Sequence, residues 1–210
     1  MIKIENTEVC GWEAAIRGMR NPMNSWDKSD SERDDFLEDF FVGEADHKLM
    51  MNLAKGGAVH AKYRRMITVY LDVTAPLYWW KEFDTYKVGT VANSCSTMHK
   101  IQAKEFTMDD FSQEHLDHWG NNNMLQLLRL LNHNREQFLE TKDKRYWWQM
   151  IQLLPSSYNQ RRTVMLNYEV LTNIYHSRKN HKLDEWHTFC EWIEKLPYSE
   201  IITGGKENAV

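Results

Sequence analysis

The most informative stretch of this sequence is RMITVYLDV, residues 65–73, because its pattern allows few folds. Every second residue from Ile67 to Val73 is a large aliphatic one, and polar or amphipathic residues stand between them. Side chains alternate between the two faces of a strand, so this period of two predicts a strand with one buried face. Ala75-Pro76 ends it, and a proline in the first turn favours a helix that continues through Phe83.

Helical periodicity dominates the rest of the chain. The predicted helices cover residues 12–19, 44–55, 122–141, 146–154, 160–177 and 183–195. No strand–helix–strand alternation is evident, so the sequence predicts an α+β fold in which helices surround a small antiparallel sheet. At this length we expect one helix-rich domain, residues 1–210, with a frayed tail from Thr203.

The composition limits the partners and the compartment. A formal net charge of −4 does not indicate the basic surface that nucleic-acid-binding proteins usually have. No apolar run approaches the ~20 residues of a membrane span. The N-terminus has no signal-peptide pattern. Cys10, Cys95 and Cys190 are odd in number and far apart, which indicates free thiols in a reducing compartment. We therefore expect a cytoplasmic protein without nucleic-acid or membrane partners.

Nine histidines raise the question of a metal site. His115 and His118 stand three residues apart, and His176, His181 and His187 are close in sequence. Without cysteine partners or an H-E-x-x-H pattern, exposed or hydrogen-bonded histidines are the favoured interpretation, and no metal ligand is assigned. A P-loop and a G-x-G-x-x-G motif are also missing from the sequence.

The C-terminal third carries a stronger signal. On a single helix over residues 160–177 and just beyond, Asn167 and Arg178 share one stripe, so Arg178 would project near Asn167. At a helix end, the paired N–H donors and the planar guanidinium of an arginine suit a phosphate or a planar heterocycle. The alternative is that both side chains cap the helix or meet solvent. Taken alone, the pattern favours this alternative.

In this segment the chain resembles the flavin-dependent thymidylate synthases. That family has a Leu-Pro pair, then a helix with two Asn and an Arg, then a His and a Trp. The residues in the same order here are Leu154-Pro155, Asn167, Asn173, Arg178, His181 and Trp186. Upstream, GGAVHAKYRRMITVYLDVTAP is similar to a family segment in which a His precedes a strand that ends in Ala-Pro, and His60 is the counterpart of that His near the flavin. The ordered similarity covers residues 44–195.

The resemblance places KEFDTYKVGTVANSCSTMHK, residues 81–100, on the loop that holds flavin and the deoxyuridine phosphate in the family. The family pattern is Arg-His-Arg, Ser, Asn-Glu, Ser and Arg-Tyr. The residues at these positions are Thr85-Tyr86-Lys87, Thr90, Ala92-Asn93, Cys95 and Thr97-Met98. Only Lys87 offers a cation, and Ile151 and Glu169 replace further family arginines.

These replacements change the expected affinity. Each charge-assisted contact is worth about 1.5–3 kcal/mol, so losing several should weaken the binding of dUMP and FAD by several kcal/mol. FAD is the cofactor that the resemblance implies, and the lost cations argue against it. The candidates for compensation are Arg64, Arg65, Arg161 and Arg162. For each of these arginines, a solvated surface role is the alternative.

The resemblance implies a set of site residues and an assembly. The cofactor-binding candidates are His60, Asn167, Asn173 and His181. The ligand-binding candidates are Glu82, Lys87, Thr90, Asn93, Cys95, Thr97 and Arg178, of which Arg178 and Cys95 are also the catalytic candidates. We expect a homotetramer in which residues 87–97 of one subunit face Arg178 of a neighbour.

Three functions remain open at this point. The first is flavin-dependent one-carbon transfer to a pyrimidine nucleotide. The second is non-catalytic binding or sequestering of a nucleotide-like ligand. The third is a structural homo-oligomer whose cleft is filled by side chains such as Tyr86 and Met98.

Overall fold

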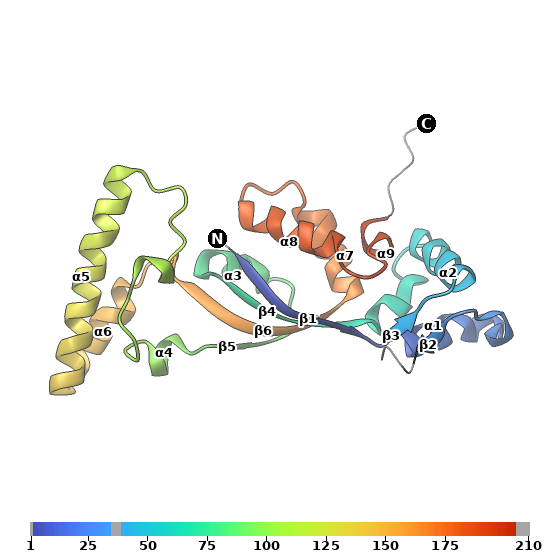
Figure 1. Ribbon diagram of the computed structural model, residues 1–210, viewed down its shortest axis with the longest axis horizontal. Helices are drawn as coiled ribbons and strands as arrows, with labels where there is room; N and C mark the ends of the chain where they lie inside the picture. The colour runs from blue at the N-terminus through green and yellow to red at the C-terminus, as the bar shows by residue number, and fades with distance from the viewer. Residues whose placement is uncertain (1, 35–38, 205–210) are drawn as a thin grey trace. The chain divides into compact units, whose positions relative to one another are not determined.

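The structure is a computed structural model that describes residues 2–34 and 39–204 (Figure 1). Its helices are α1 Trp12–Arg20, α2 Glu44–Lys55, α3 Leu77–Phe83, α4 Thr97–Lys100, α5 His118–Thr141, α6 Lys144–Leu153, α7 Tyr168–Arg178, α8 Asp184–Glu194 and α9 Glu200–Thr203. Its strands are β1 Lys3–Cys10, β2 Glu32–Asp34, β3 Asp39–Phe41, β4 Thr68–Pro76, β5 Val91–Ser94 and β6 Asn159–Asn167. Short 3-10 helices are η1 Asn21–Met23, η2 Trp26–Lys28, η3 Ala61–Arg65 and η4 Met108–Asp110.

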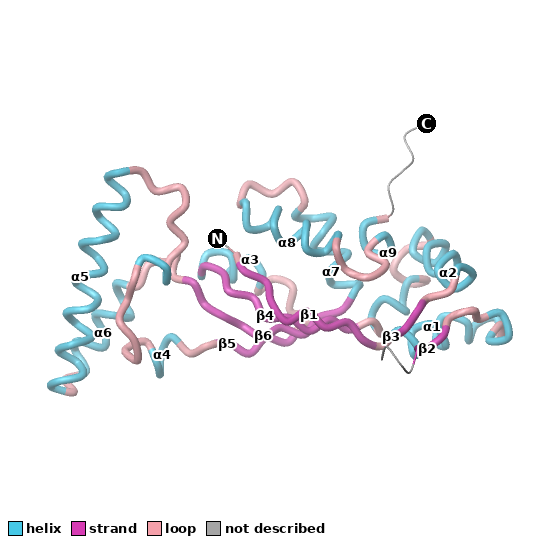
Figure 2. The backbone as a smooth tube through the Cα atoms, in the orientation of Figure 1, coloured by secondary structure: helices cyan, strands magenta, loops and turns pink. Residues whose placement is uncertain are grey.

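The described strands form a four-stranded sheet and a two-stranded one, drawn in magenta in Figure 2. The order of the larger sheet is β1-β4-β6-β5, and β2 pairs antiparallel with β3, with Arg33 opposite Phe40. Strand β4 confirms the strand predicted over residues 65–73, shifted by three residues, and buries alternate residues from Val69 to Ala75. The helix-rich α+β fold with a small antiparallel sheet is therefore confirmed.

The helix predicted over residues 160–177 is wrong in its first half, which is strand β6. Buried Val164 and Leu166 alternate with less buried neighbours, which is the period of a strand. Helix α7 begins only after Asn167, whose Oδ1 accepts a hydrogen bond from the Val170 amide at 3.0 Å. Asn167 and Arg178 therefore lie at opposite ends of α7, roughly 16 Å apart at 1.5 Å of rise per residue. The prediction that Arg178 projects near Asn167 is wrong.

The chain divides into two compact units. Unit 1 consists of Met1–Lys3, Asp72–Thr85 and Asn93–Thr163, and unit 2 of Ile4–Leu71, Tyr86–Ala92 and Val164–Val210. The single domain expected over residues 1–210 stays a prediction. Thr203 ends helix α9, so the frayed tail does not begin there, and residues 205–210 lie outside the described part of the chain.

Each unit has its own packed interior. In unit 1, α5 and α6 lie side by side (Figure 1) and enclose Ile101, Phe106, Phe111, Leu128, Leu131 and Met150. In unit 2, α7 packs on α8, α9 and η3, and its first residue Tyr168 meets Trp12 edge-to-face at 5.3 Å between ring centroids. No helix in residues 2–34 and 39–204 has the length and apolar character to cross a membrane.

Candidate functional site

Arg178, the residue that the sequence singles out, is held by two aromatic side chains of unit 2. Its Nε donates a hydrogen bond to Tyr86 Oη at 2.9 Å. Its guanidinium carbon lies 4.9 Å from the ring centroid of Trp186 and 5.6 Å from that of Tyr86. Both distances are within the range of cation–π attraction. Arg178 is half-buried, and its orientation is fixed by the hydrogen bond from Nε and by the two aromatic rings.

Helices α7 and α8 set this arrangement. Arg178 is the last residue of α7, and Trp186 lies fully buried in the first turns of α8. His181, in the connection between the two helices, lies 6.3 Å from the Trp186 ring, and its Nδ1 accepts a hydrogen bond from the Leu183 amide at 3.2 Å. The short connection therefore brings Arg178, His181 and Trp186 together, as their order in the sequence suggested.

The loop 86–92 lies against the other end of α7. Gly89 has a φ of 79°, and a Cβ there would be 3.1 Å from Asn167 Nδ2 and 3.3 Å from Val170 Cγ2. A side chain at this position would have to displace these neighbours, and its positive φ would be strained. Next to it, the Thr90 hydroxyl oxygen is buried and has no hydrogen-bond partner among the described residues. Thr90 and Asn167 are thus in one neighbourhood.

The other predicted residues of unit 2 do not join this cluster. His60 precedes η3 and is exposed, Asn173 is exposed on α7, and Lys87 is exposed on the loop. The single cation retained from the family loop therefore faces solvent in this chain.

In unit 1, the predicted residues Cys95 and Thr97 line a cavity of about 280 Å³. The lining residues are Thr74, Cys95, Ser96, Thr97, Lys104, Asp109, Asp110, Tyr158, Asn159, Gln160 and Arg161. The backbone of Cys95 is fixed on both sides, because its amide donates to the Arg161 carbonyl at 2.9 Å and its carbonyl accepts from Gln160 Nε2 at 2.8 Å. Asn93 is exposed on β5 and Glu82 is half-buried in α3, and neither lines this cavity.

The charges around this cavity are nearly balanced. Lys104 forms an ion pair with Asp110, and this hydrogen bond raises the pKa of Lys104. Burial raises the pKa of Tyr158, and the Asp110 carboxylate adds to the effect. Arg161 donates to Asp72 Oδ2 at 2.7 Å. The cavity is rich in hydroxyl, amide and carboxylate groups but has no excess of cations among its described lining residues.

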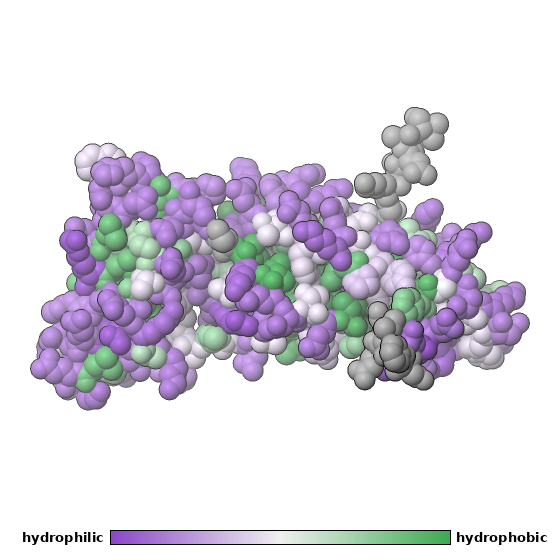
Figure 3. All heavy atoms as spheres, in the orientation of Figure 1, coloured by the Kyte–Doolittle hydropathy of each residue, from purple (hydrophilic) through white to green (hydrophobic). Residues whose placement is uncertain are grey.

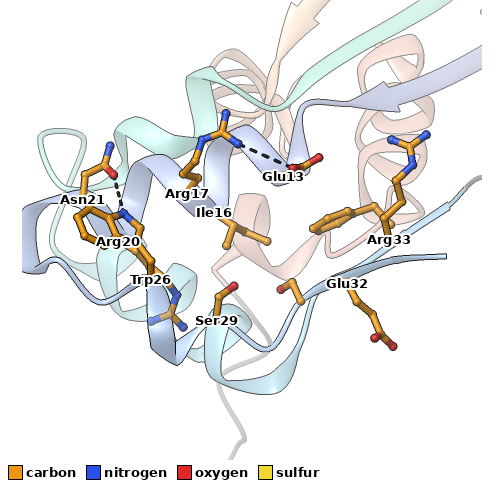
Figure 4. A pocket seen from close by; sticks show the side chains of 11 residues that line it. Glu13, Ile16, Arg17, Arg20, Asn21, Trp26, Ser29, Glu32 and Arg33 are labelled. Atoms are coloured by element: carbon orange, nitrogen blue, oxygen red, sulfur yellow. Dashed lines mark hydrogen bonds and ion pairs between the residues drawn. The ribbon is translucent and has the colours of Figure 1, made fainter. Parts of the chain in front are cut away.

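A cavity of about 660 Å³ in unit 2 contains none of the predicted site residues. It lies between α1 and the β2–β3 hairpin, with Ile16, Trp26 and Ser29 on its walls (Figure 4). Its loop wall is held by Arg20, which pairs with the fully buried Asp46 at 2.6 Å and donates to the Lys28 carbonyl at 2.8 Å. Arg20 and Asp46 thus neutralise each other and hold the loop in place, so their burial is explained without a ligand.

Asp46 is the acceptor that organises that loop. Burial by itself would raise the pKa of Asp46, but hydrogen bonds from Ser29, Ser31 and Arg20 outweigh burial and lower it. The Ser29 and Ser31 hydroxyls each donate to Asp46 Oδ2 at 2.7 Å. Because these contacts join residues that are distant in the sequence, no local sequence pattern predicts them.

Comparison with solved structures identifies the fold. The protein is similar to ThyX, the flavin-dependent thymidylate synthase from Helicobacter pylori complexed with FAD and dUMP, with a TM-score of 0.67 and 14% identity over 95% of this chain and 96% of that one. It is also similar to the UMP/dUMP methylase PolB from Streptomyces cacaoi bound with 5-Br dUMP, with a TM-score of 0.60 and 14% identity over 97% of this chain and 95% of that one. With 5-Br UMP bound, the same methylase gives a TM-score of 0.63 at 12% identity.

The chain has the ThyX fold. No family model matches the sequence, and no curated protein matches it. The fold that the resemblance over residues 44–195 implied is confirmed, and the shared fold extends over nearly the whole chain.

At one position of the family pattern the structure explains a replacement. Glu169 stands where the resemblance expects a cofactor-facing Arg, and its Oε2 lies 3.8 Å from Nη1 of the buried Arg64. Arg64 also donates from Nη2 to the Ile201 carbonyl. Arg64 is therefore an internal partner of Glu169 and does not replace the lost cations at a ligand.

The other compensation candidates are also engaged or exposed. Arg162 donates to Asp84 Oδ1 at 2.7 Å and lies 4.2 Å above the Trp80 ring. Arg161 pairs with Asp72, and Arg65 is exposed. A flavin diphosphate needs cations or backbone donors, and the carboxylate of Glu169 occupies one expected cation position. The residues of this chain do not fit a ThyX-like FAD site.

Sequence reasoning missed several residues around the unit 1 cavity. Lys104, Asp110 and Tyr158 line it, and none of them belongs to the family pattern. The local signal in the sequence is Thr107-Met-Asp-Asp, in which Thr107 and Asp110 form a capping box at the start of η4. Among the described residues there is no group of three or more His, Cys, Asp or Glu that is arranged to hold a metal ion.

Proposed function

We propose that this protein binds a pyrimidine-nucleotide-like ligand. The observation that carries the proposal is Arg178, which keeps its place in the ThyX-like order and has its guanidinium fixed by Tyr86 and Trp186. A guanidinium whose orientation is already fixed loses less entropy when it binds a phosphate or a carbonyl-rich base. The structural neighbours are complexed with dUMP and with 5-Br UMP, which supports this ligand class.

The unit 1 cavity at Cys95–Thr97 is the second part of the proposal. Its hydroxyl and amide groups suit the edge of a pyrimidine base or a sugar, which hydrogen-bonds without needing a strong positive field. Its balanced charge makes it a poor place for a bare phosphate. We therefore propose the unit 1 cavity for the neutral parts of a nucleotide-like ligand. Arg178 in unit 2 is proposed separately, as a contact for an anionic or carbonyl group.

Thermal unfolding tests the proposal directly. With dUMP at a hundredfold excess over its dissociation constant, the free energy of unfolding should rise by about 2.7 kcal/mol. Deoxyuridine, which lacks the phosphate, should stabilise the protein less. If neither compound nor UMP changes the melting temperature, the proposal is wrong and the structural homo-oligomer is the better reading.

The chain contains its own control for occupancy of the unit 1 cavity. Cys95 and Cys10 are both exposed free thiols, but only Cys95 lines this cavity. Bound dUMP should slow alkylation of Cys95 by iodoacetamide and leave the rate at Cys10 unchanged. Equal rates at Cys95 with and without dUMP would remove this cavity from the proposal.

Catalysis is the second candidate, and Cys95 is the observation that favours it. Its thiol stands at a ligand cavity, where a nucleophile would be placed. Flavin-dependent one-carbon transfer further requires bound FAD, and Glu169 at an expected cation position argues against it. A yellow purified protein with flavin absorbance would support it, and a colourless protein whose melting temperature responds to dUMP but not to FAD would support binding without catalysis.

A homotetramer remains part of the proposal. Helix α5 exposes Trp119 by 74% and Leu125, Leu130 and Leu139 by about 40% each. In Figure 3, apolar residues interrupt the hydrophilic surface over this helix. Exposed apolar patches of this kind often mark subunit interfaces. Light scattering of the eluting protein should give four times 25.1 kDa, and a monomer mass would overturn the assembly.

A further inference from the structure

The unit 1 cavity contains polar groups that have no partner among the described residues. Its lysine and its arginine are already engaged, because Lys104 pairs with Asp110 and Arg161 pairs with Asp72. Within residues 2–34 and 39–204, unpaired side-chain atoms remain on lining residues that include Asp109, Tyr158 and Asn159. These atoms are available to a ligand.

The Tyr158 hydroxyl is the most informative of these groups. The ring packs edge-to-face against the buried Phe111, with 5.6 Å between ring centroids, so its position is fixed. Burial is the largest cause that raises the pKa of Tyr158, and the charges of Asp110, Lys104 and Cys95 also act on this pKa. All three line the cavity, so the hydroxyl lies beside it. The hydroxyl keeps its proton at neutral pH and is a ready donor.

Asn159 and Asp109 complete the set. Asn159 Oδ1 accepts a hydrogen bond from Ser112 Oγ at 2.9 Å, which orients the amide and leaves its NH2 group for a ligand. Asp109 on η4 is exposed, and its carboxylate has no hydrogen bond or ion pair in the described part of the chain. Neither the Tyr158 oxygen nor Asn159 Nδ2 is among the fully buried unpaired atoms of that part, so both are open to the cavity.

The size and polarity of the cavity select one part of a nucleotide. Its volume of about 280 Å³ is just below the roughly 300–1,000 Å³ of ordinary ligand pockets, so it suits one ring and not the whole molecule. A uracil ring has one N–H donor for a carboxylate, whereas ribose has two adjacent hydroxyls that each donate and accept. A deoxyribose lacks the 2′-hydroxyl and would leave part of the set unpaired, which costs affinity.

We propose that the unit 1 cavity holds the ribose of the ligand, and that the protein prefers a ribonucleotide to the corresponding deoxyribonucleotide. Asp109 accepts hydrogen bonds from the 2′- and 3′-hydroxyls. Tyr158 and Asn159 donate to the oxygens of the same hydroxyls. This preference rests on the nucleotide binding proposed above and specifies which sugar the ligand carries.

Calorimetric titration of the whole protein with UMP and with dUMP tests the preference. UMP should bind about tenfold more tightly than dUMP, because the 2′-hydroxyl adds a hydrogen bond to a charged group. Equal affinities, or tighter binding of dUMP, would overturn the preference and leave nucleotide binding intact. Binding of neither compound would overturn nucleotide binding and the preference together, so the two failures are distinguishable.

Variants locate the preference in the cavity. Asp109→Ala removes an exposed side chain and should reduce the ratio of UMP affinity to dUMP affinity to near one. Tyr158→Phe keeps the ring, and should lower UMP affinity more than dUMP affinity. Glu105→Ala is the matched control, because Glu105 is exposed in the same segment but does not line the cavity, and both affinities should equal those of the wild type. An unchanged ratio in Asp109→Ala, or an equal loss in Glu105→Ala, would refute the site.

Discussion

Arg178 donates a hydrogen bond from Nε to Tyr86 Oη at 2.9 Å, across 92 residues of sequence. In the family that the chain resembles, a His stands at the position of Tyr86. The replacement gives this chain an aromatic hydroxyl that fixes its best-retained arginine from within the same unit. The predicted loop and the predicted arginine are therefore connected by a contact that the family pattern does not contain.

Removing Arg178 should strongly weaken nucleotide binding without disrupting the assembly. Arg178→Ala eliminates a charge-assisted contact worth about 1.5–3 kcal/mol, so dUMP affinity should fall at least tenfold. Calorimetry measures the affinity and light scattering the mass. Arg145→Ala, at an arginine whose side chain is 84% exposed, is the control and should bind as the wild type does. Unchanged affinity in Arg178→Ala would refute the assignment.

Two variants at Tyr86 should separate its hydroxyl from its ring. Tyr86→Phe removes only the acceptor for Arg178 and should lower the free energy of unfolding by about 0.5–1.5 kcal/mol. Tyr86→Leu also removes the ring that faces the guanidinium, and should cost about 0.5–1 kcal/mol more. Urea unfolding measures both. Equal stability of the two variants would show that the ring contributes nothing.

Asp46→Asn should destabilise the protein at neutral pH but much less in acid. Breaking the buried pair with Arg20 costs about 3–5 kcal/mol. The folded-state pKa of Asp46 is lowered, so its contribution is fully present above the unfolded value of about 3.9 and is lost as pH falls through the folded value. Urea unfolding at pH 7 and at stepwise lower pH values measures the change. Asp27→Asn, at an exposed carboxyl, is the control, and a pH-independent loss for Asp46→Asn would contradict this explanation.

The three cysteines should differ in reactivity. Cys10 and Cys95 are exposed, whereas Cys190 is buried on α8. Burial, with a smaller contribution from Glu194, raises the pKa of Cys190 to about 11, so it stays a thiol at pH 8. A disulfide reagent should titrate two thiols in the native protein and three after unfolding. Three rapid equivalents in the native state would show that α8 does not shield Cys190.

The part of the candidate site that follows from the sequence is the part whose residues are close together along the chain. Arg178, His181 and Trp186 come together across a short turn, and local sequence fixes that arrangement. His60 and Asn173 followed the same order but are exposed and do not join the cluster. The order of residues in the sequence predicts which side chains are neighbours on one helix or turn. It does not predict which side of that helix packs against the rest of the protein.

By itself, the sequence determined the elements whose periodicity is local: strand β4 and helices α2, α5, α6 and α8. Tertiary structure alone decided that residues 159–167 form a strand, because its residues gain their backbone partners from distant segments of the sheet. It also decided how the charges pair, as Arg20 with Asp46 and Arg64 with Glu169. A buried charge takes whichever partner the fold brings close, and those partners are 26 and 105 residues away along the chain.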